Sequence, residues 1–327
     1  MIRPVLLAAQ GARAGQLAEF AGDVRSGLLS RPKTLPPRWF YDAVGSALFE
    51  AICQLPEYGV MRADDRLLRR HAPEIAARLG PVPLVAELGS GTGRKTRAVL
   101  AALTGRTSLT YRPIDVSATA LERCRRELSR VPGVRVEALE ADFLAGLRDV
   151  AGARRDGERA LVLFLGGTLG NFERPAALDF LGAVRATLQP GDALLLGADL
   201  LKSEERLLAA YDDAAGVTAA FNLNVLARIN RELGGNFDLR GFAHEARWDA
   251  SARRIEMHLR ALRPQAVTVS AAGVRAEFEE GETIWTETSS KFAPEELPAL
   301  AVAAGFRTEA QWVDAEWPFA ECLWGAA

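Results

Sequence analysis

A glycine-rich turn directly after a short apolar run is the feature that most constrains the fold of this chain. Residues 84–86 read Leu-Val-Ala, and residues 87–96 read Glu-Leu-Gly-Ser-Gly-Thr-Gly-Arg-Lys-Thr. This pattern predicts a strand that runs into a tight turn and then opens a helix. In α/β proteins such a turn is where a nucleotide-like cofactor binds. The segment therefore predicts both a type of sheet and a cofactor site.

Strand and helix patterns alternate around this turn. Short apolar runs predict the strands, and longer segments with helical spacing predict the helices between them. We expect strands at residues 84–88, 109–115, 134–140, 160–165 and 193–196, and helices at residues 63–80, 94–104, 117–130 and 175–188. Such alternation predicts an α/β fold, a Rossmann-like parallel sheet with helices on both faces.

The alternation of strand and helix patterns ends after residue 199, which indicates a second lobe. Residues 203–233 are expected to be helical, and residues 15–62 to form two helices around a proline-rich bend. Short alternating segments predict an antiparallel meander with strands at residues 246–248, 255–262, 267–270 and 275–279. A helix at 294–304 and strands near 307–314 and 321–325 are expected to return to the first sheet.

We therefore expect two domains, each built from separate parts of the chain. Residues 63–199 and 292–327 would form the cofactor-binding domain, and residues 1–62 and 200–291 an α+β substrate-binding lobe. A cleft between two lobes is a usual place for a small-molecule site.

Composition argues against several classes of partner. The net charge of -2 gives no reason to expect nucleic acid or an anionic membrane. No apolar run approaches the roughly 20 residues of a membrane span. Cys53, Cys124 and Cys322 lack CxxC spacing and the three histidines are scattered, so we expect no metal site. We expect a cytoplasmic monomer that acts on a small molecule.

The spacing of the glycine turn distinguishes between cofactors. A dinucleotide-binding turn needs a third glycine three residues after the second, and counting from Gly89 and Gly91 that position is Arg94. A phosphate-binding Walker loop needs a glycine directly before its lysine, whereas Arg94 precedes Lys95. The acid-x-Gly-x-Gly-x-Gly form instead resembles motif I of class I S-adenosylmethionine (SAM)-dependent methyltransferases.

Two acidic positions after neighbouring strands fit this resemblance. Asp115 ends the second strand, where a carboxylate can bind both ribose hydroxyls, and Asp142 and Phe143 follow the third, where they can hold adenine. Each has an alternative interpretation: a solvated strand-end acid for Asp115, and a turn acid beside a core aromatic for the pair.

Blocks of sequence along nearly the whole chain resemble the histidine-specific methyltransferases of ergothioneine biosynthesis. The first blocks are residues 32–49, which include Pro-Pro-Arg-Trp-Phe-Tyr-Asp, and residues 55–58, Leu-Pro-Glu-Tyr. Further blocks are residues 87–96, 164–171, 210–213, 255–257 and 286–292. The resemblance implies trimethylation of the α-amino group of L-histidine to hercynine, with three SAM molecules, and a two-lobed architecture.

The resemblance also implies roles for residues at matching positions. The cofactor contacts are Gly89, Lys95, Asp115, Asp142 and Phe143. The substrate's amine and carboxylate would be held by Tyr58, Asn171 and Tyr211, its imidazole read by Glu287 and Ser289, and the pocket walled by Tyr41 and Met257.

The residue types suit this substrate. A carboxylate such as Glu287 can accept the imidazole N–H, and a hydroxyl such as Ser289 can complement the other nitrogen. Positions i and i+2 of an extended segment point the same way. Without the resemblance, both would be interpreted as a solvent-facing strand edge. The sequence offers no dedicated strong base, so we assign none.

The chain departs from the family pattern at two places. Tyr58 is followed by Gly59-Val60-Met61-Arg62, where relatives usually carry a second aromatic and a proline. Gly93 stands where some relatives have a polar residue, and we expect this change to be neutral.

Three other functions remain as alternatives. A same-family methyltransferase for another amino acid, such as tryptophan, would be expected to lose the carboxylate at 287 and shrink residue 257. An NAD-dependent dehydrogenase is disfavoured by Arg94. A non-catalytic binding protein is disfavoured by the intact cofactor positions.

Overall fold

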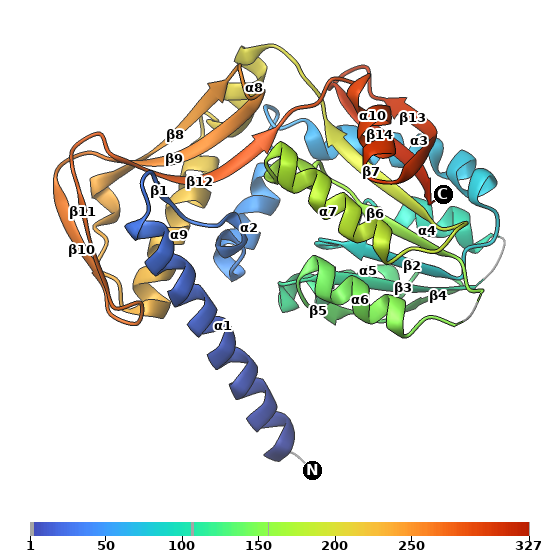
Figure 1. The fold of residues 1–327 in the computed structure, drawn as a ribbon, viewed down its shortest axis with the longest axis horizontal. Helices are drawn as coiled ribbons and strands as arrows, with labels where there is room; N and C mark the ends of the chain where they lie inside the picture. The colour runs from blue at the N-terminus through green and yellow to red at the C-terminus, as the bar shows by residue number, and fades with distance from the viewer. Residues whose placement is uncertain (1–2, 106–107, 156, 327) are drawn as a thin grey trace. The chain divides into compact units, whose positions relative to one another are not determined.

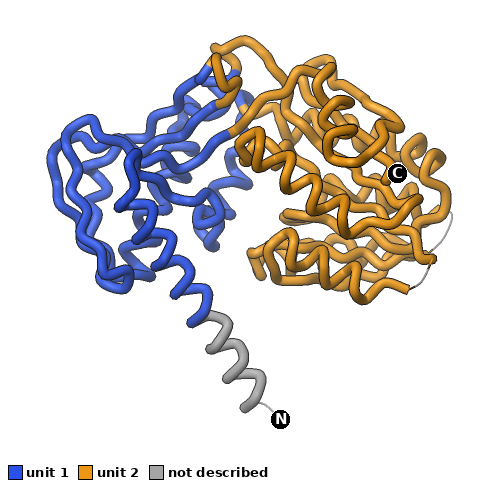
Figure 2. The backbone as a smooth tube through the Cα atoms, in the orientation of Figure 1, with its two compact units in different colours: residues 1–57, 207–249, 255–288 blue, residues 58–206, 250–254, 289–327 orange. Residues whose placement is uncertain are grey.

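The glycine-rich turn follows β2, the strand at which the order of a large mixed sheet reverses (Figure 1). The computed structural model describes residues 3–105, 108–155 and 157–326, with side chains described from residue 14 onward. Its contacts divide the chain into two compact units (Figure 2). Unit 1 comprises residues 1–57, 207–249 and 255–288, and unit 2 comprises residues 58–206, 250–254 and 289–327. The assignment of separate cofactor and substrate roles to two domains stays a prediction.

Unit 2 contains the predicted α/β sheet. Its strand order is β13-β14-β7-β6-β2-β3-β4, and β5 pairs with β3. The ladders among β2, β3, β4, β5, β6 and β7 are parallel, whereas β14 runs antiparallel to both β7 and β13. The bounds are β2 Leu84–Leu88, β3 Leu109–Asp115, β4 Val134–Val136, β5 Leu139–Glu140, β6 Ala160–Phe164, β7 Ala193–Asp199, β13 Phe306–Val313 and β14 Phe319–Ala326.

Helices cover both faces of this sheet, as predicted. Successive strand side chains point to opposite faces, so Leu84 and Ala86 belong to one buried core and Val85 to the other. The first core is completed by α6 Phe143–Gly152, α7 Arg174–Ala186 and α10 Glu296–Ala303. The second is completed by α3 Val60–Leu79, α4 Arg97–Thr104 and α5 Ala118–Leu128. Among the described residues, no helix is long and apolar enough to cross a membrane.

The edge of the sheet differs from the sequence prediction. The strand expected at 134–140 is interrupted, because β4 pairs as far as Tyr111 and β5 resumes pairing at Ile114. Tyr111 and Asp115 accept bonds from this edge through their carbonyl oxygens. Pro113 lies midway between them and has no N–H to contribute to the ladder.

The helices of unit 2 differ from the sequence prediction at two places. The helix expected at 94–104 begins at Arg97, because residues 94–96 belong to the turn. Helix α6 was not predicted. It contains Gly146, which weakens a helical pattern, but a Cβ there would lie 2.5 Å from Ile114 Cγ2, so the glycine lets this helix pack closely on β3.

Unit 1 combines helices with two small sheets. One sheet has the order β1-β12-β9-β8, and β10 and β11 form a separate antiparallel pair. The predicted single meander was therefore wrong. An extended segment was expected at Glu287 and Ser289, but its start at Thr283 and its pairing with β1 were not predicted. The strands are β1 Lys33–Thr34, β8 Phe242–Asp249, β9 Arg254–Ala261, β10 Gln265–Val269, β11 Val274–Phe278 and β12 Thr283–Ser290. The first residue of β9 and the last two of β12 belong to unit 2. The helices are α1 Arg3–Leu29, α2 Ala43–Ile52, α8 Glu204–Tyr211 and α9 Val217–Leu233, with 3-10 turns at Pro37–Phe40 and Leu239–Gly241.

The helix predicted at 203–233 is broken after α8. Asp213 accepts the backbone N–H groups of Val217 and Thr218 at 3.0 and 2.7 Å, which satisfies two donors of the first turn of α9. Gly216 precedes α9 with φ of 75°. This local capping is more favourable than a continuous helix through Gly216.

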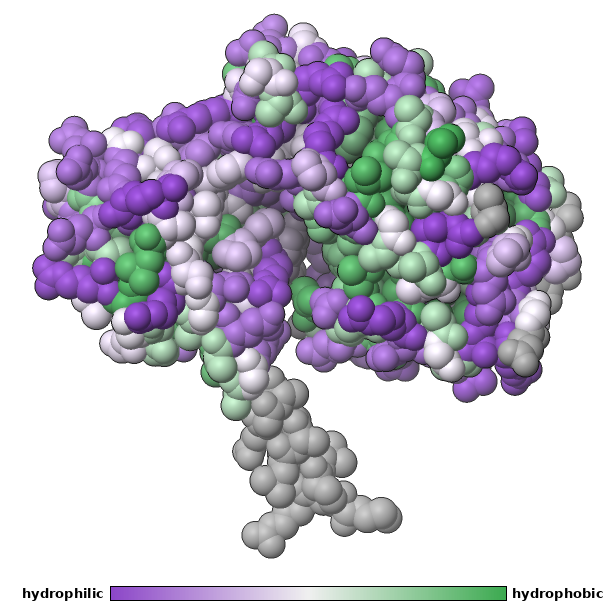
Figure 3. All heavy atoms as spheres, viewed as in Figure 1, coloured by the Kyte–Doolittle hydropathy of each residue, from purple (hydrophilic) through white to green (hydrophobic). Residues whose placement is uncertain are grey.

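Hydrophilic residues cover much of the visible face of each unit (Figure 3). The exposed large hydrophobic side chains come from separate parts of the chain: Leu29, Val44, Val116, Leu262, Val302 and Val313.

Candidate functional site

The three glycines of the turn after β2 all have positive φ, at 70° for Gly89, 53° for Gly91 and 70° for Gly93. A Cβ on Gly91 would meet no atom within 4 Å, so open space adjoins the backbone there. A Cβ on Gly93 would lie 2.7 Å from both Cys124 Sγ and Leu128 Cδ1. This glycine therefore lets the turn pack against α5, and the expectation that Gly93 is a neutral departure from the family pattern stays a prediction.

The Asp115 side chain links the turn to the end of β3 by hydrogen bonds. Its Oδ2 accepts the N–H of Gly91 at 3.0 Å, and its Oδ1 accepts the N–H of Ser117 at 2.9 Å. Burial raises the pKa of Asp115, while the bonds from Ser117, Gly91 and Val116 work in the opposite direction. The carboxylate is thus fixed at the carboxyl edge of the sheet, beside the open flank of Gly91.

Asp142 and Phe143 begin α6 at the next position along this edge. Asp142 caps the helix through Oδ1, which accepts the N–H of Ala145 at 2.8 Å. The Phe143 ring packs edge-on against Phe164, with centroids 5.6 Å apart. A Cβ on Gly89 would lie 3.4 Å from the Phe143 ring. The first glycine and this aromatic are therefore neighbours, although 54 positions separate Gly89 from Phe143 (143 − 89).

Lys95, near the end of the turn, has its ammonium group in a cluster of buried acids. Its Nζ is 2.6 Å from Oδ2 of Asp64, and the same oxygen accepts the N–H of Gly166 at 2.9 Å. Burial opposes the charge of Lys95, but Asp64 and Glu87 outweigh burial and raise its pKa. Sequence reasoning missed Asp64, because only the fold brings α3 beside the turn.

Glu87 and Glu321 complete this cluster, and both side chains are almost fully buried. Burial raises the pKa of Glu87 to about 7, against the lowering influence of Lys95. Glu87 accepts hydrogen bonds from Thr96 Oγ1, at 2.9 and 2.7 Å, and from the Tyr111 hydroxyl. Burial and the neighbouring Asp64 raise the pKa of Glu321.

Three of the predicted substrate residues belong to unit 2. Tyr58 is buried and directly precedes α3, and Asn171 ends the 3-10 turn Thr168–Asn171 that follows β6. Ser289 lies near the end of β12, and a Cβ on Gly170 would be 3.4 Å from Ser289 Oγ. The absence of a side chain at Gly170 lets β12 approach the turn that carries Asn171.

The departure after Tyr58 has a structural counterpart. A Cβ on Gly59 would lie 2.3 Å from the ring of Trp317, so the tryptophan fills the space beside Gly59. Cations of Lys202 and Arg206 each lie 4.7 Å from the centre of this ring. Trp317, in the loop before β14, thus occupies the space that a side chain at position 59 would need.

The remaining predicted substrate residues belong to unit 1. Tyr41 packs edge-on against Phe49 and Phe221, at centroid separations of 5.6 and 5.8 Å. Met257 is buried on β9, Tyr211 ends α8, and Glu287 is half-buried on β12.

A buried amide network supports this part of unit 1. His244 donates from Nε2 to the carbonyl of Tyr211 and accepts from Asn222 at Nδ1, both at 2.8 Å. Asn222 Oδ1 lies 2.8 Å from the Thr286 hydroxyl, which is 2.9 Å from the carbonyl of Met257. Asn222 and Thr286 were not predicted. Asn222 on the buried face of a helix would have been the available signal, because buried amides are normally bonded.

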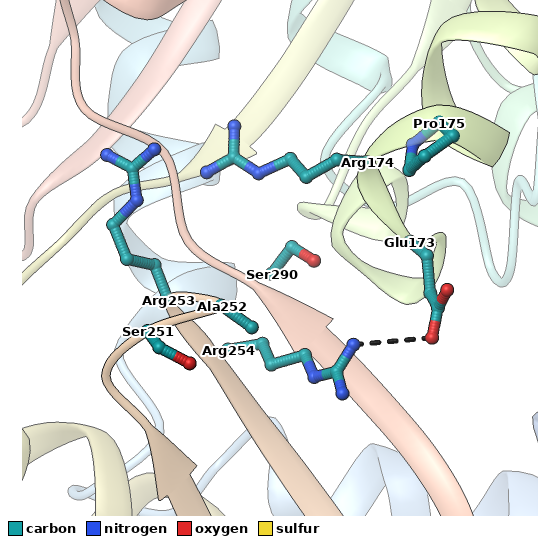
Figure 4. Close-up of a pocket in the computed structure, with 8 residues that line it drawn as sticks. All are labelled: Glu173, Arg174, Pro175, Ser251, Ala252, Arg253, Arg254 and Ser290. Carbon is teal, nitrogen blue, oxygen red and sulfur yellow. Dashed lines mark hydrogen bonds and ion pairs between the residues drawn. The ribbon is translucent and has the colours of Figure 1, made fainter.

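Unit 2 also holds a cavity with three arginines among the eight residues that line it (Figure 4). Its volume is about 260 Å³ and its lining includes Arg174, Arg253, Arg254 and Ser290. Each arginine is paired with an acid: Arg254 with Glu173, and the other two with Glu296. None of the predicted site residues lines this cavity.

The cofactor positions fit an adenosyl group joined to an amino acid. The open flank of Gly91 admits a ligand against bare backbone, and the fixed carboxylate of Asp115 can accept from ribose hydroxyls. Ligands of such sheets bind beyond the carboxyl ends of the strands, where the strand order reverses. This chain therefore has the fold and the cofactor turn of a class I SAM-dependent methyltransferase.

Comparison with known proteins narrows this class. The family described as "Histidine-specific methyltransferase, SAM-dependent" matches residues 20–326, and this chain belongs to that family. The chain is 47% identical to the histidine N-alpha-methyltransferase of Mycolicibacterium smegmatis, over 89% of this chain and 90% of the relative. It is 46% identical to the protein of that name in Mycobacterium tuberculosis, over 93% and 94%. A more distant relative is the L-tryptophan methyltransferase of Psilocybe serbica, 28% identical over 92% and 91%.

Proposed function

We propose that this protein transfers three methyl groups from SAM to the α-amino group of L-histidine, giving hercynine for ergothioneine biosynthesis. The observation that carries the proposal is membership of the histidine-specific family along residues 20–326. Two relatives that share nearly half of their residues with this chain are both named histidine N-alpha-methyltransferase.

Five residues would hold the cofactor, which supplies an electrophilic methyl group on a sulfonium. The backbone at Gly89 lies beside the ring of Phe143, so that ring can cover the adenine face. Asp115 would bind the ribose hydroxyls, and Asp142 the adenine amino group. Lys95 would pair with the cofactor's carboxylate, and its bond to Asp64 holds the ammonium group in place.

The substrate's amino-acid head would bind to Tyr58, Asn171 and Tyr211. Phenol and amide groups hydrogen-bond a zwitterion without a strong opposite charge that would retain a trimethylated product. Glu287 and Ser289 would read the imidazole from one face of β12, and Tyr41 and Met257 would form the pocket wall.

Methyl transfer requires the amine lone pair to lie opposite the bond that breaks. The protein's task is then chiefly to orient a neutral amine in a near-attack geometry. Removal of the substrate from water lowers an ammonium pKa and favours loss of its proton. We assign no residue as the proton acceptor.

The test is incubation of the purified protein with SAM and the twenty amino acids, with products read by mass spectrometry. The proposal expects a gain of three methyl groups on histidine and no gain on the other amino acids. A reaction on tryptophan alone would favour the second candidate, a same-family enzyme for an indolic amino acid. No methylation of any amino acid would overturn both.

The chain's own residues favour histidine over tryptophan. Glu287 retains the carboxylate that an indole pocket would lose, and Met257 occupies a buried position where an indole pocket would need a smaller side chain. We further propose that the protein acts as a monomer in the cytoplasm, where SAM and histidine are made.

A further inference from the structure

Lys291, the residue directly after β12, has its side chain fully buried in unit 2. Its Nζ donates to the hydroxyl oxygen of Ser289 at 2.8 Å and lies 2.8 Å from Oδ2 of Asp199. Lysine was expected here only as part of the block at residues 286–292. The structure thus brings the Lys291 ammonium group into contact with Ser289, a residue that is expected to contact the substrate.

The backbone of Lys291 is held on both sides. Its N–H donates to the carbonyl of Arg253, and its carbonyl accepts from the Arg174 guanidinium, each at 2.8 Å. Glu296 forms ion pairs with both arginines. Figure 4 shows these arginines beside Ser290, the residue between Ser289 and Lys291. Two arginines of the cavity lining, Arg174 and Arg253, therefore hold the backbone from which the Lys291 side chain extends.

The charges around the lysine ammonium form a buried triad. Asp199 binds Lys291 and Lys202, with Lys202 at 2.6 Å, and also accepts from the Trp317 indole at 3.2 Å. Burial opposes the charge of Asp199, but the two lysines outweigh burial and lower its pKa. Burial lowers the pKa of Lys202 to about 8. Arg206, beyond Lys202, also contributes positive charge.

An ammonium group can only donate hydrogen bonds, whereas a hydroxyl can accept two and donate one. With Lys291 donating to its oxygen, the Ser289 hydroxyl is biased to act as a donor. A neutral imidazole has one nitrogen that accepts and one that donates. Imidazolium has two donors and no acceptor, so it cannot receive a hydrogen bond from Ser289.

We propose that Lys291 is a positioning residue that makes Ser289 a hydrogen-bond donor, so that the enzyme selects the neutral imidazole of its substrate. This inference rests on the proposed function, in which Ser289 contacts the ring. Glu287 accepts the N–H of one ring nitrogen, and Ser289 donates to the other. Binding of the protonated ring loses the Ser289 bond and adds a further positive charge near the buried lysines.

The test compares Lys291→Met with Lys202→Met. Both substitutions remove a buried lysine from Asp199, but only Lys291 bonds to Ser289 in the described contacts. We expect Lys291→Met to raise the KM for histidine about tenfold, the worth of one charge-assisted hydrogen bond, with little change in the KM for SAM. Lys202→Met should leave the histidine KM within about twofold, and Lys291→Arg, which keeps a cationic donor, should recover part of the loss.

A second measurement separates positioning from folding. The affinity for hercynine is measured from pH 5 to 8, because its quaternary nitrogen has no proton to lose. Wild-type affinity should fall about tenfold per pH unit below the ring pKa of about 6.5. In Lys291→Met the fall should be shallower, because Ser289 can then turn to accept from imidazolium. Identical pH profiles for the wild type and Lys291→Met would overturn the inference, even if Lys291→Met were less stable than the wild type.

Ser289→Ala distinguishes failure of this inference from failure of the proposed site. If Ser289→Ala raises the histidine KM but Lys291→Met does not, the positioning role is wrong and ring contact by Ser289 stands. If neither Ser289→Ala nor Glu287→Ala raises the histidine KM, the assignment of the imidazole site is wrong. If Lys291→Met has no further effect in a Ser289→Ala background, the two residues act through one contact, as the inference requires.

Discussion

The backbone N–H of Gly91 lies 3.0 Å from Oδ2 of Asp115, so the second glycine of the turn is joined to the end of the neighbouring strand. This bond fixes the carboxylate that is proposed to bind the ribose. Substitution Asp115→Asn keeps the size of the side chain but removes its charge and one acceptor oxygen. We expect the KM for SAM to rise about tenfold and the KM for histidine to change far less.

Steady-state kinetics with each substrate varied in turn would check this expectation. Asp149→Asn, an exposed acid on α6, is the matched control and should behave as wild type. Equal increases in both KM values would indicate a general disturbance and contradict a cofactor-specific role for Asp115.

Gly93 and Gly91 permit a direct test of packing at the turn. Both have positive φ, so alanine strains the backbone at either position. At Gly93 the new Cβ would also meet Cys124 and Leu128 at 2.7 Å, whereas at Gly91 it would meet nothing within 4 Å. We expect Gly93→Ala to lower the free energy of unfolding by about 1–3 kcal/mol more than Gly91→Ala does.

Urea denaturation of the two variants would measure this difference. Equal losses would mean that α5 moves away at little cost and that Gly93 has no special packing role.

The sheet could be predicted because its signals are local. The strands at 84–88 and 109–115 begin and end where the sequence predicted them. The features that were not predicted depend on distant contacts. Helix α6 contains Gly146, which packs on Ile114, and β12 pairs in parallel with β1 across some 250 residues of chain (Lys33 with Ile284). No local pattern contains such information.

The site divides in the same way. The cofactor turn came from a local motif, whereas the roles of the cofactor and substrate residues came from resemblance to a family. The buried charged residues that contact these positions could not be predicted from the sequence. Asp64 pairs with Lys95 across 31 positions and Asp199 with Lys291 across 92 (291 − 199). Charged residues are usually exposed, so only the fold shows which of them are buried together.

Glu287 is expected to determine the choice of substrate ring. Substitution Glu287→Ala removes the carboxylate proposed to accept the imidazole N–H. The KM for histidine should rise at least tenfold, while the KM for SAM stays within about twofold, because a hydrogen bond to a charged group is worth about 1.5–3 kcal/mol. Glu277→Ala, an exposed acid on β11, is the control. An unchanged histidine KM for Glu287→Ala would rule out the imidazole-reading role.

Glu87 should make the stability of the protein depend on pH. Its pKa is about 7 in the folded protein against an ordinary value of 4.5, and the main cause is burial. The folded state thus holds this proton more tightly than the unfolded chain does. The resulting stabilisation is fully present below about pH 4.5 and is lost as the pH rises to about 7.

Substitution Glu87→Gln removes this titration and can keep bonds to Thr96 and Tyr111. The stability of Glu87→Gln relative to wild type should therefore increase between pH 5 and pH 8, by up to about 3 kcal/mol at 1.36 kcal/mol per pKa unit. Urea denaturation at pH 5, 6, 7 and 8 would measure this difference, with the exposed Glu140→Gln as control. A difference that stays constant over this range would mean that Lys95 compensates the Glu87 charge fully, and that Glu87 is ionised throughout.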